Sequence, residues 1–256
     1  MRYAFQVQYV GKNYAGSQIQ FENGEQIVTP TIQGELEKAI STLIFGDTEN
    51  KDRQIKTIFS GRTDKGVNSK GQVVHFDSDK SIVASKFVYQ LNEILPPDIS
   101  VSDLKEVDDK FHAQKSAKRR YYRFVFINRK CKNAFDGDLM RVKYPINIEK
   151  MQKALDFIKG EHDFSSFKSS GTLNPSKICF IEKATCHKDG DNVIIDIVGN
   201  RFLYNMVRTI VGTLLEIEGH KLPAEHMEQV LMACDRRKAG QTVSPFGLTL
   251  MKVEYN

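Results

Sequence analysis

The hydrophobic and polar positions of this chain follow two different periods. In residues 2–9 an apolar side chain occupies every second position, which predicts a half-buried strand. In residues 32–46 the apolar side chains instead have helical spacing, which predicts an amphipathic helix. Thr29 and Pro30 precede this helix and are expected to form its cap and its first turn.

The same two periods continue to the end of the chain. Further strands are predicted at residues 55–60, 72–76, 99–107, 119–127, 178–187, 193–198 and 247–255. Further helices are predicted at residues 87–95, 147–160, 203–217 and 223–234. Because strands and helices do not alternate strictly, the sequence favours an α+β protein of two mixed halves, with largely antiparallel sheets flanked by helices. The acidic stretch 103–110 marks the expected boundary, which gives domains at 1–107 and 108–256.

Composition narrows the class of protein. The chain has 256 residues, of which 40% are hydrophobic and 27% charged, so it can bury a core without disulfides or metals. A disordered or fibrous protein is thereby excluded. No apolar run reaches the ~20 residues of a membrane helix, and the first residues lack the core of a signal peptide. We therefore expect a soluble cytoplasmic protein with no membrane partner.

Cysteines, histidines and net charge suggest little chemistry by themselves. The four cysteines form no C-x-x-C pair and the six histidines are scattered, which predicts reduced thiols and no metal site. The net charge of +5 favours a polyanionic partner, but only weakly.

Residues 61–67 are the densest candidate for chemistry. Their two glycines resemble a phosphate loop, but the lysine and hydroxyl that should follow the second glycine are missing. In extended backbone Arg62 and Asp64 share a face, so the guanidinium would keep the carboxylate ionised and aimed, as a nucleophile or base requires. The alternative is that Asp64 is a turn residue and Arg62 its surface partner. Spacing alone favours this second interpretation.

Basic and aromatic residues alternate in residues 115–124. Basic groups hold phosphates and aromatic faces stack on unpaired bases, which is what a protein that handles flipped or single-stranded nucleotides needs. The segment could equally be a solvated strand edge, with Phe124 in the core. Arg201 and Arg208 could extend a positive track or solvate helix ends.

Several ordered motifs resemble one known family. Residues 59–67 (Phe-Ser-Gly-Arg-Thr-Asp-Lys-Gly-Val) and 71–76 (Gly-Gln-Val-Val-His-Phe) closely resemble the catalytic motif of the TruA family of pseudouridine synthases. Further similar motifs cover nearly the whole chain: Tyr9-x-Gly11, Gly16-x-Gln18, Phe111-His112-Ala113, Ala117-x-x-Arg120-x-Tyr122-x-Phe124, and the segments 160–167, 201–212 and 245–255. Agreement of this extent strongly disfavours the interpretation of Asp64 as a plain surface residue.

The resemblance implies an isomerase. Members of the family convert uridine to pseudouridine in the anticodon stem-loop of tRNA, at positions 38 to 40, usually as homodimers and without a cofactor or a metal. The family fold has two α+β halves that form a central RNA-binding cleft. By resemblance, Asp64 is the nucleophile and Arg62 is its ion-pair partner and a wedge in the space of the flipped base. Tyr122 would stack on the uracil, Arg120 and Arg208 would bind the RNA, and Leu248 would line the pocket.

Some questions stay open at the level of sequence. An ionised Asp64 could attack the ribose C1′ or the uracil C6, or abstract the C2′ proton to give a glycal. Ser17 replaces the usual tryptophan and Asn68 the frequent histidine of the family pattern, which could alter RNA contacts. A paralogue acting on ribosomal RNA and a catalytically silent RNA-binding protein of the same fold remain the alternatives. A small-molecule enzyme would need a phosphate or metal site, which the sequence does not offer.

Overall fold

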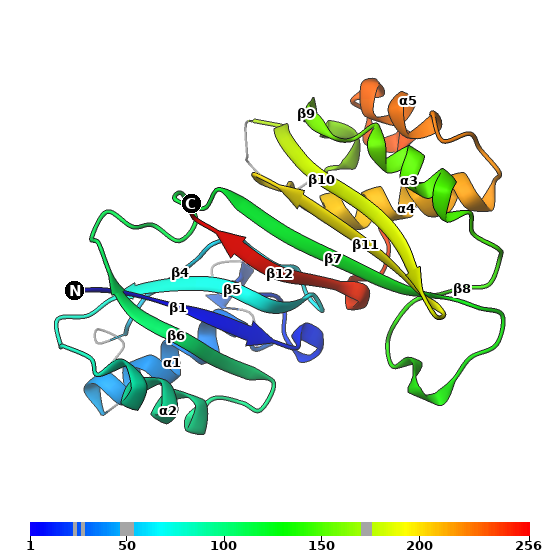
Figure 1. Ribbon diagram of the computed structural model, residues 1–256. Helices are drawn as coiled ribbons and strands as arrows, with labels where there is room; N and C mark the ends of the chain where they lie inside the picture. Colours follow the sequence, from blue (N-terminus) through cyan, green and yellow to red (C-terminus); the bar gives the residue numbers. More distant parts are fainter. Residues whose placement is uncertain (23–24, 27–28, 47–53, 170–175) are drawn as a thin grey trace. The chain divides into compact units, whose positions relative to one another are not determined.

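The computed structural model describes residues 1–22, 25–26, 29–46, 54–169 and 176–256. Two compact units make up the chain (Figure 1). Unit 1 consists of Met1–Lys118 with Leu250–Asn256, and unit 2 of Arg119–Thr249. None of the helices in these described ranges is long and apolar enough to cross a membrane.

Unit 1 is a sheet with two helices. Its strand order is β6-β1-β5-β12, and β4 pairs with β5. The strands are β1 (Arg2–Tyr9), β4 (Thr57–Phe59), β5 (Asn68–Asp77), β6 (Ile99–Val107) and β12 (Leu248–Glu254), beside the two-residue strands β2 (Phe21–Glu22) and β3 (Glu25–Gln26). The helices are α1 (Ile32–Phe45) and α2 (Ala84–Ile94). The β1 strand is antiparallel to both β5 and β6.

The core of unit 1 lies between the sheet and its helices. The alternation in β1 buries Tyr3, Phe5 and Val7 against a cluster that includes Leu36 and Ile40 of α1. The helix begins at Ile32, and its N-cap is the Thr31 side chain, two residues after the Thr29 that the sequence suggested as the cap. Its hydroxyl oxygen accepts a hydrogen bond from the Gly34 N–H at 3.1 Å.

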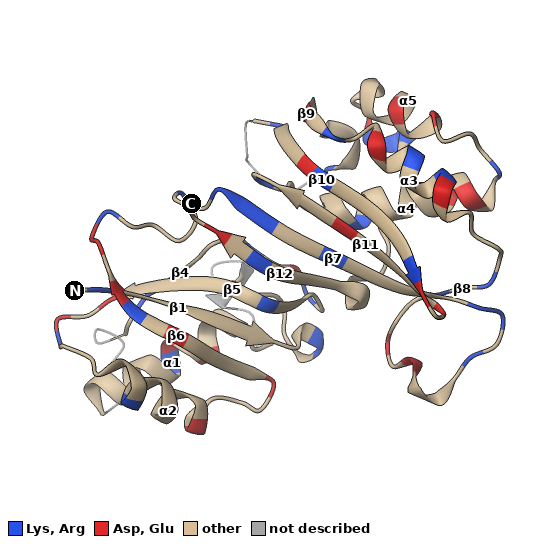
Figure 2. Ribbon diagram, in the orientation of Figure 1, with Lys and Arg blue, Asp and Glu red and all other residues tan. Residues whose placement is uncertain are grey.

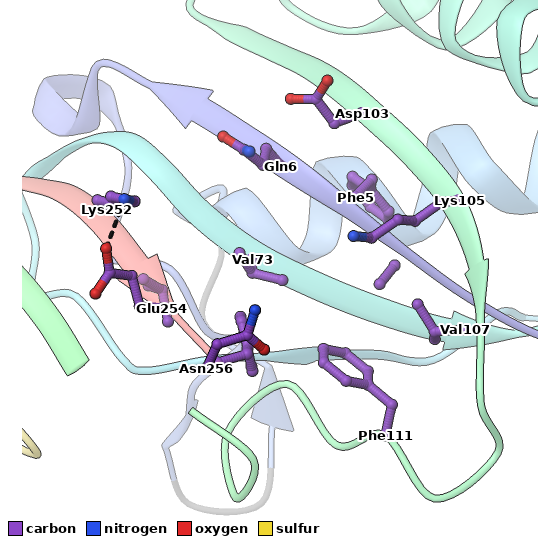
Figure 3. Close-up of a pocket in the computed structure, with 13 residues that line it drawn as sticks. Phe5, Gln6, Val73, Asp103, Lys105, Val107, Phe111, Lys252, Glu254 and Asn256 are labelled. Carbon is purple, nitrogen blue, oxygen red and sulfur yellow. Dashed lines mark hydrogen bonds and ion pairs between the residues drawn. The ribbon is translucent and has the colours of Figure 1, made fainter. Parts of the chain in front are cut away.

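The opposite face of this sheet holds an open pocket. Val74 and Phe76 of β5 face the helices, so the residues between and beside them, including Val73 and His75, face the other way. Figure 3 shows the pocket on that face, with Gln6, Val73, Lys105 and Phe111 among its labelled lining residues. Its volume is about 650 Å³.

Unit 2 has the same type of architecture. Its strand order is β7-β11-β10-β9 with β8 beside β7. The strands are β7 (Arg119–Asn128), β8 (Arg141–Val142), β9 (Gly160–Asp163), β10 (Ile178–Asp189) and β11 (Asn192–Gly199), and the helices are α3 (Ile148–Asp156), α4 (Met206–Gly219) and α5 (His226–Ala233). The pairs β7–β11, β10–β11 and β9–β10 are antiparallel, and β7–β8 is parallel. The α+β class with largely antiparallel sheets is therefore confirmed.

The core of unit 2 confirms the alternation predicted for β7. Phe124 and Phe126 are fully buried and stand opposite Ile195 and Val193 of β11. The side chain of Asn147 caps α3, as expected, by accepting the Lys150 N–H at 3.0 Å. The α4 helix begins at Met206, three residues after the predicted start.

The two units differ from the domains expected at 1–107 and 108–256. The segment 108–118 packs with unit 1, and the last strand returns to unit 1 at Leu250. Whether 1–107 and 108–256 behave as separate domains stays a prediction.

Candidate active site

The loop between β4 and β5 carries Asp64, and its main chain is held at Thr63. The Thr63 N–H donates to the Ser17 hydroxyl oxygen at 2.8 Å, and the Ser17 N–H donates to the Thr63 carbonyl at 3.0 Å. The Thr63 hydroxyl also shares a 2.8 Å hydrogen bond with the Tyr9 hydroxyl. Ser17, Thr63 and Tyr9 are all buried, so water does not compete for these bonds.

A buried glutamine supports the start of the loop. Gln72 of β5 donates to the Gly61 carbonyl at 2.8 Å and to the Tyr9 hydroxyl at 3.4 Å, and it accepts from the Ser60 hydroxyl at 2.5 Å. Burial raises the pKa of Tyr9 to about 12, so its hydroxyl keeps its proton at neutral pH. The network therefore keeps the same hydrogen bonds across the physiological pH range.

Asp64 follows directly on this anchored residue. Its main chain forms an antiparallel bridge with Gly16, and its carbonyl accepts the Val67 N–H at 3.1 Å. Gly16 has φ +122° and a Cβ there would lie 2.9 Å from the Thr63 carbonyl oxygen, so only glycine fits. The Asp64 side chain is half-buried. A carboxylate on so fixed a loop, still within reach of a ligand, can serve as nucleophile or base.

Arg62 is exposed on the same loop. Its Nε donates to the Gln18 side-chain oxygen, so Gln18 is the partner seen for it. The ion pair between Arg62 and Asp64 stays a prediction.

The two departures from the family pattern have structural roles. Ser17 supplies the hydroxyl that receives the Thr63 N–H, and Asn68 accepts the Gly11 N–H at 2.9 Å. Ser17 thus holds the loop of Asp64, and Asn68 holds the chain after β1. That these two positions alter RNA contacts stays a prediction. The motif segments containing Tyr9, Ser17 and Gln72 were visible in the sequence, but hydrogen-bond partners were not.

Tyr122 stands in unit 2, on β7. It faces the same side as Phe124 and Phe126, opposite Ile197 of β11, and is half-buried. The Tyr122 and Phe202 rings pack edge to face, with ring centroids 5.0 Å apart and planes at 80°. This contact restrains the tyrosine ring without hiding it fully.

The other three predicted residues also belong to unit 2. Arg120 lies two residues before Tyr122 and donates to the Asn200 carbonyl at 2.5 Å. Arg208 of α4 donates to the Val243 carbonyl at 2.8 Å and to the Asn205 side-chain oxygen at 2.7 Å. Leu248 is 5% exposed and follows the 3-10 turn Pro245–Gly247. That turn packs on β7, because a Cβ on Gly247 would lie only 2.3 Å from the Val125 carbonyl oxygen.

Acidic residues balance part of the predicted basic track. Figure 2 shows Lys and Arg along β7, with acidic positions on β10 and β11. Arg119 pairs with Glu182 at 2.5 Å, and Arg123 pairs with Asp196 through two hydrogen bonds of 2.8 and 2.9 Å. These two arginines are less available to phosphates than the sequence alone suggested.

The structure thus groups the predicted residues in two sets. Asp64 and Arg62 share one loop of unit 1, whereas Arg120 and Tyr122 of β7, Arg208 of α4 and Leu248, the first residue of β12, belong to unit 2. None of the six lines the pocket of Figure 3.

Comparisons with known proteins give a consistent result. Residues 154–256 match the family model described as tRNA pseudouridine synthase. The chain is 41% identical over 254 residues to tRNA pseudouridine synthase A of Thermoanaerobacter sp. (strain X514), with 97% of each chain covered. It is 39% identical to the protein of that name from Brevibacillus brevis, with 96% of each chain covered, and 38% identical to that of Bacillus licheniformis over the full length of both.

Among solved structures, a crystal structure of a Cbf5-Nop10-Gar1 complex aligns with a TM-score of 0.36 and 10% identity, covering 97% of this chain and 58% of that chain. At this TM-score the likeness adds nothing to the assignment. The curated relatives are 38 to 41% identical to this chain over almost its whole length, and this similarity shows that the chain belongs to the tRNA pseudouridine synthase A family.

Proposed function

We propose that this protein isomerises uridine to pseudouridine in the anticodon stem-loop of tRNA. Membership of the family, whose curated relatives bear the name tRNA pseudouridine synthase A, supports the reaction and the class of RNA. The observation that carries the proposal is the loop of Asp64, whose neighbour Thr63 has its main-chain N–H and C=O bonded to Ser17.

Asp64 is proposed as the nucleophile. The reaction breaks the bond between N1 and C1′, turns the uracil, joins C5 to C1′ and returns the C5 proton to solvent, with no net redox change. An ionised Asp64 attacks C1′ or C6, or removes the C2′ proton to give a glycal; each route restores the carboxylate at the end. All three routes need the uridine flipped out of its stack, at a cost of a few kcal/mol.

The remaining residues are proposed to hold the flipped nucleotide. Tyr122 stacks on the uracil, which contributes ~1–3 kcal/mol for a base on an aromatic ring, and it assists removal of the C5 proton. Arg62 fills the space that the base leaves, Arg120 and Arg208 contact the RNA, and Leu248 forms part of the pocket wall. The proposal requires that Asp64 and Tyr122 meet the same nucleotide.

The test uses tRNA transcripts that carry C5-tritiated uridine. Asp64→Asn keeps the shape of the side chain but removes the nucleophile, so we expect tritium release to fall by roughly 10⁴-fold while RNA affinity changes little. Asp79→Asn, at an exposed aspartate of the same unit, is the matched control and should release tritium at the wild-type rate. A rate for Asp64→Asn within about tenfold of wild type would rule out the nucleophile.

Mapping the product separates the substrate classes. Release from tRNA with modification at positions 38 to 40 supports the proposal, and release from ribosomal RNA alone supports a paralogue. Binding without release from any RNA supports a silent RNA-binding protein. We further propose that the protein works as a homodimer in the cytoplasm, which sedimentation of the pure protein and cell fractionation would test.

A further inference from the structure

The segment that joins the two units is attached to unit 1 at both ends and in its middle. We call residues 108–118, between β6 and β7, the connector. Near its start, Arg2 of β1 donates to the carbonyls of Asp109 at 2.5 Å and Phe111 at 2.8 Å. At its end, the Lys118 N–H donates to the Glu254 carbonyl of β12 at 2.7 Å.

Ala113 is the middle attachment and is completely buried. Its N–H donates to Nδ1 of His75 at 3.1 Å, and its carbonyl accepts the Tyr255 hydroxyl at 2.8 Å. The rings of Phe111 and Tyr255 pack with centroids 5.0 Å apart. Both main-chain groups of one connector residue are thus satisfied by side chains, one from β5 and one from the residue that follows β12.

His75 can accept this bond only while it is neutral. It is 1% exposed on β5, and because Nδ1 is the acceptor, the single proton of the neutral ring sits on Nε2. Nε2 is buried without a hydrogen-bond partner among the described residues. The centroid of the His75 ring lies 5.3 Å from that of His112 and 6.0 Å from that of Phe111.

The surroundings keep the ring neutral. Burial, with Arg2 of β1 and His112 of the connector, lowers the pKa of His75 to about 4, against a smaller opposing effect of Asp77. Asp77 itself holds Arg2 through two hydrogen bonds of 2.8 Å, so it orients the arginine that reaches the connector.

We propose that His75, Arg2 and Tyr255 are positioning residues that clasp the connector to unit 1 and so fix the start of β7, from which Tyr122 reaches the uridine. Tyr122 follows Lys118 by four residues, a distance of at most about 14 Å along a strand. The inference rests on the proposed role of Tyr122. The clasp also links two motif segments that are far apart in sequence. His75 of the segment 71–76 supplies the hydrogen-bond acceptor for the Ala113 N–H of the segment 111–113.

Two tyrosines provide a matched test in the full-length protein. Tyr255→Phe removes the hydroxyl bound to the connector but keeps the ring. Tyr144→Phe removes an equivalent hydroxyl in unit 2, which donates to the Leu215 carbonyl at 2.9 Å. We expect kcat for tritium release to fall roughly tenfold in Tyr255→Phe, with KM little changed, because a small misplacement of a reacting group lowers the rate steeply. Tyr144→Phe should keep the wild-type kcat.

Two histidine variants add a rescue. His75→Leu has no acceptor for the Ala113 N–H, whereas His75→Asn offers a carbonyl oxygen near the position of Nδ1. We expect deuterium uptake of the peptide 108–118 to be faster in His75→Leu and Tyr255→Phe than in wild type, and His75→Asn to recover slow uptake and most of kcat. Uptake is measured by mass spectrometry without RNA, so it reports on the clasp whatever the substrate.

Each outcome decides a separate question. Faster uptake with unchanged kcat would overturn the positioning role, and unchanged uptake in both variants would overturn the clasp itself. If His75→Asn behaved like His75→Leu, the hydrogen bond would not be the cause. A wild-type protein that released no tritium from any RNA would instead overturn the proposed function, a result that no comparison among variants can produce.

Discussion

At the scale of single residues, Thr63 decides where its two neighbours point. Its side chain turns inward to the Tyr9 hydroxyl, and Asp64 beside it has the strand-like pairing of an antiparallel bridge. In such backbone adjacent side chains point to opposite faces, so Arg62 and Asp64 both point outward. The residue that the motif places between them is therefore the anchor of the loop, and Ser17 is the partner of that anchor.

Removing the Ser17 hydroxyl should lower kcat as well as the stability of the fold. In Ser17→Ala the buried Thr63 N–H loses its acceptor, which we expect to cost about 1–3 kcal/mol of stability and to lower kcat for tritium release. Ser41→Ala is the matched control, because the buried Ser41 hydroxyl accepts the Ile55 N–H at 2.9 Å elsewhere in unit 1. Thermal unfolding should show similar losses in both variants. Equal kcat values in the two would show that Ser17 is not needed to hold Asp64.

At the scale of elements, the position of the Arg208 side chain depends on a close contact between α4 and the segment 240–243, at Gly212 and Gly240. The segment 240–243 passes directly over α4, because a Cβ on Gly212 would lie 1.7 Å from the Gln241 carbonyl oxygen. A Cβ on Gly240 would lie 2.7 Å from Gly212 in turn. This close approach brings the Val243 carbonyl to Nε of Arg208, one turn before Gly212 on the helix.

Gly212→Ala should therefore disturb Arg208 at a distance. The added methyl group has to push the segment 240–243 away from α4, which we expect to cost about 1–3 kcal/mol of stability or more and to raise the Kd for RNA. Gly219→Ala, in the same helix, meets only the Tyr144 ring at 3.4 Å and should be neutral or slightly stabilising. Thermal unfolding and filter binding of tRNA measure the two effects. An unchanged Kd in Gly212→Ala would separate Arg208 from RNA binding.

At the scale of the whole molecule, net charge says less than the placement of charges. The net charge of +5 counts Arg2, Arg119 and Arg123, each of which is paired with a carboxylate on another strand of its own unit. Such exposed pairs contribute only about 0–1 kcal/mol each. The dependence of stability on pH should instead come largely from buried groups such as His75.

His75 should make the protein lose stability on mild acidification. The unfolded chain takes up this proton below about pH 6.5, whereas the folded protein resists it down to about pH 4. The unfolded state binds more protons between these two pH values. The contribution of neutral His75 to the free energy of unfolding is therefore complete above pH 6.5 and is lost as the pH falls towards 4. We expect Tm to fall less steeply across this window in His75→Asn than in wild type.

The exposed His187 supplies the control for that experiment. His187→Asn removes one histidine without touching the connector, so its Tm should follow the wild-type profile. If both variants behaved alike, the acid sensitivity would have to come from another group.

Much of the fold and part of the site could be predicted from local pattern. The period of two in residues 2–9 and 119–127 located β1 and β7, because the alternation of strand side chains depends only on neighbours in sequence. Residues 61–67 identified Asp64 through a motif, again within a short segment. The cap of α1 was placed wrongly at Thr29 and Pro30, because several adjacent residues can cap a helix and only the backbone geometry selects Thr31.

The sequence by itself determined the element pattern, the α+β class and the identity of the reactive loop. Only the tertiary structure decided what holds the functional side chains, because those partners are remote in sequence: Ser17 and Thr63 are 46 residues apart, and His75 and Ala113 are 38 apart. A buried hydrogen bond between such residues follows from how strands are paired and which face a connector covers, and no local pattern encodes either.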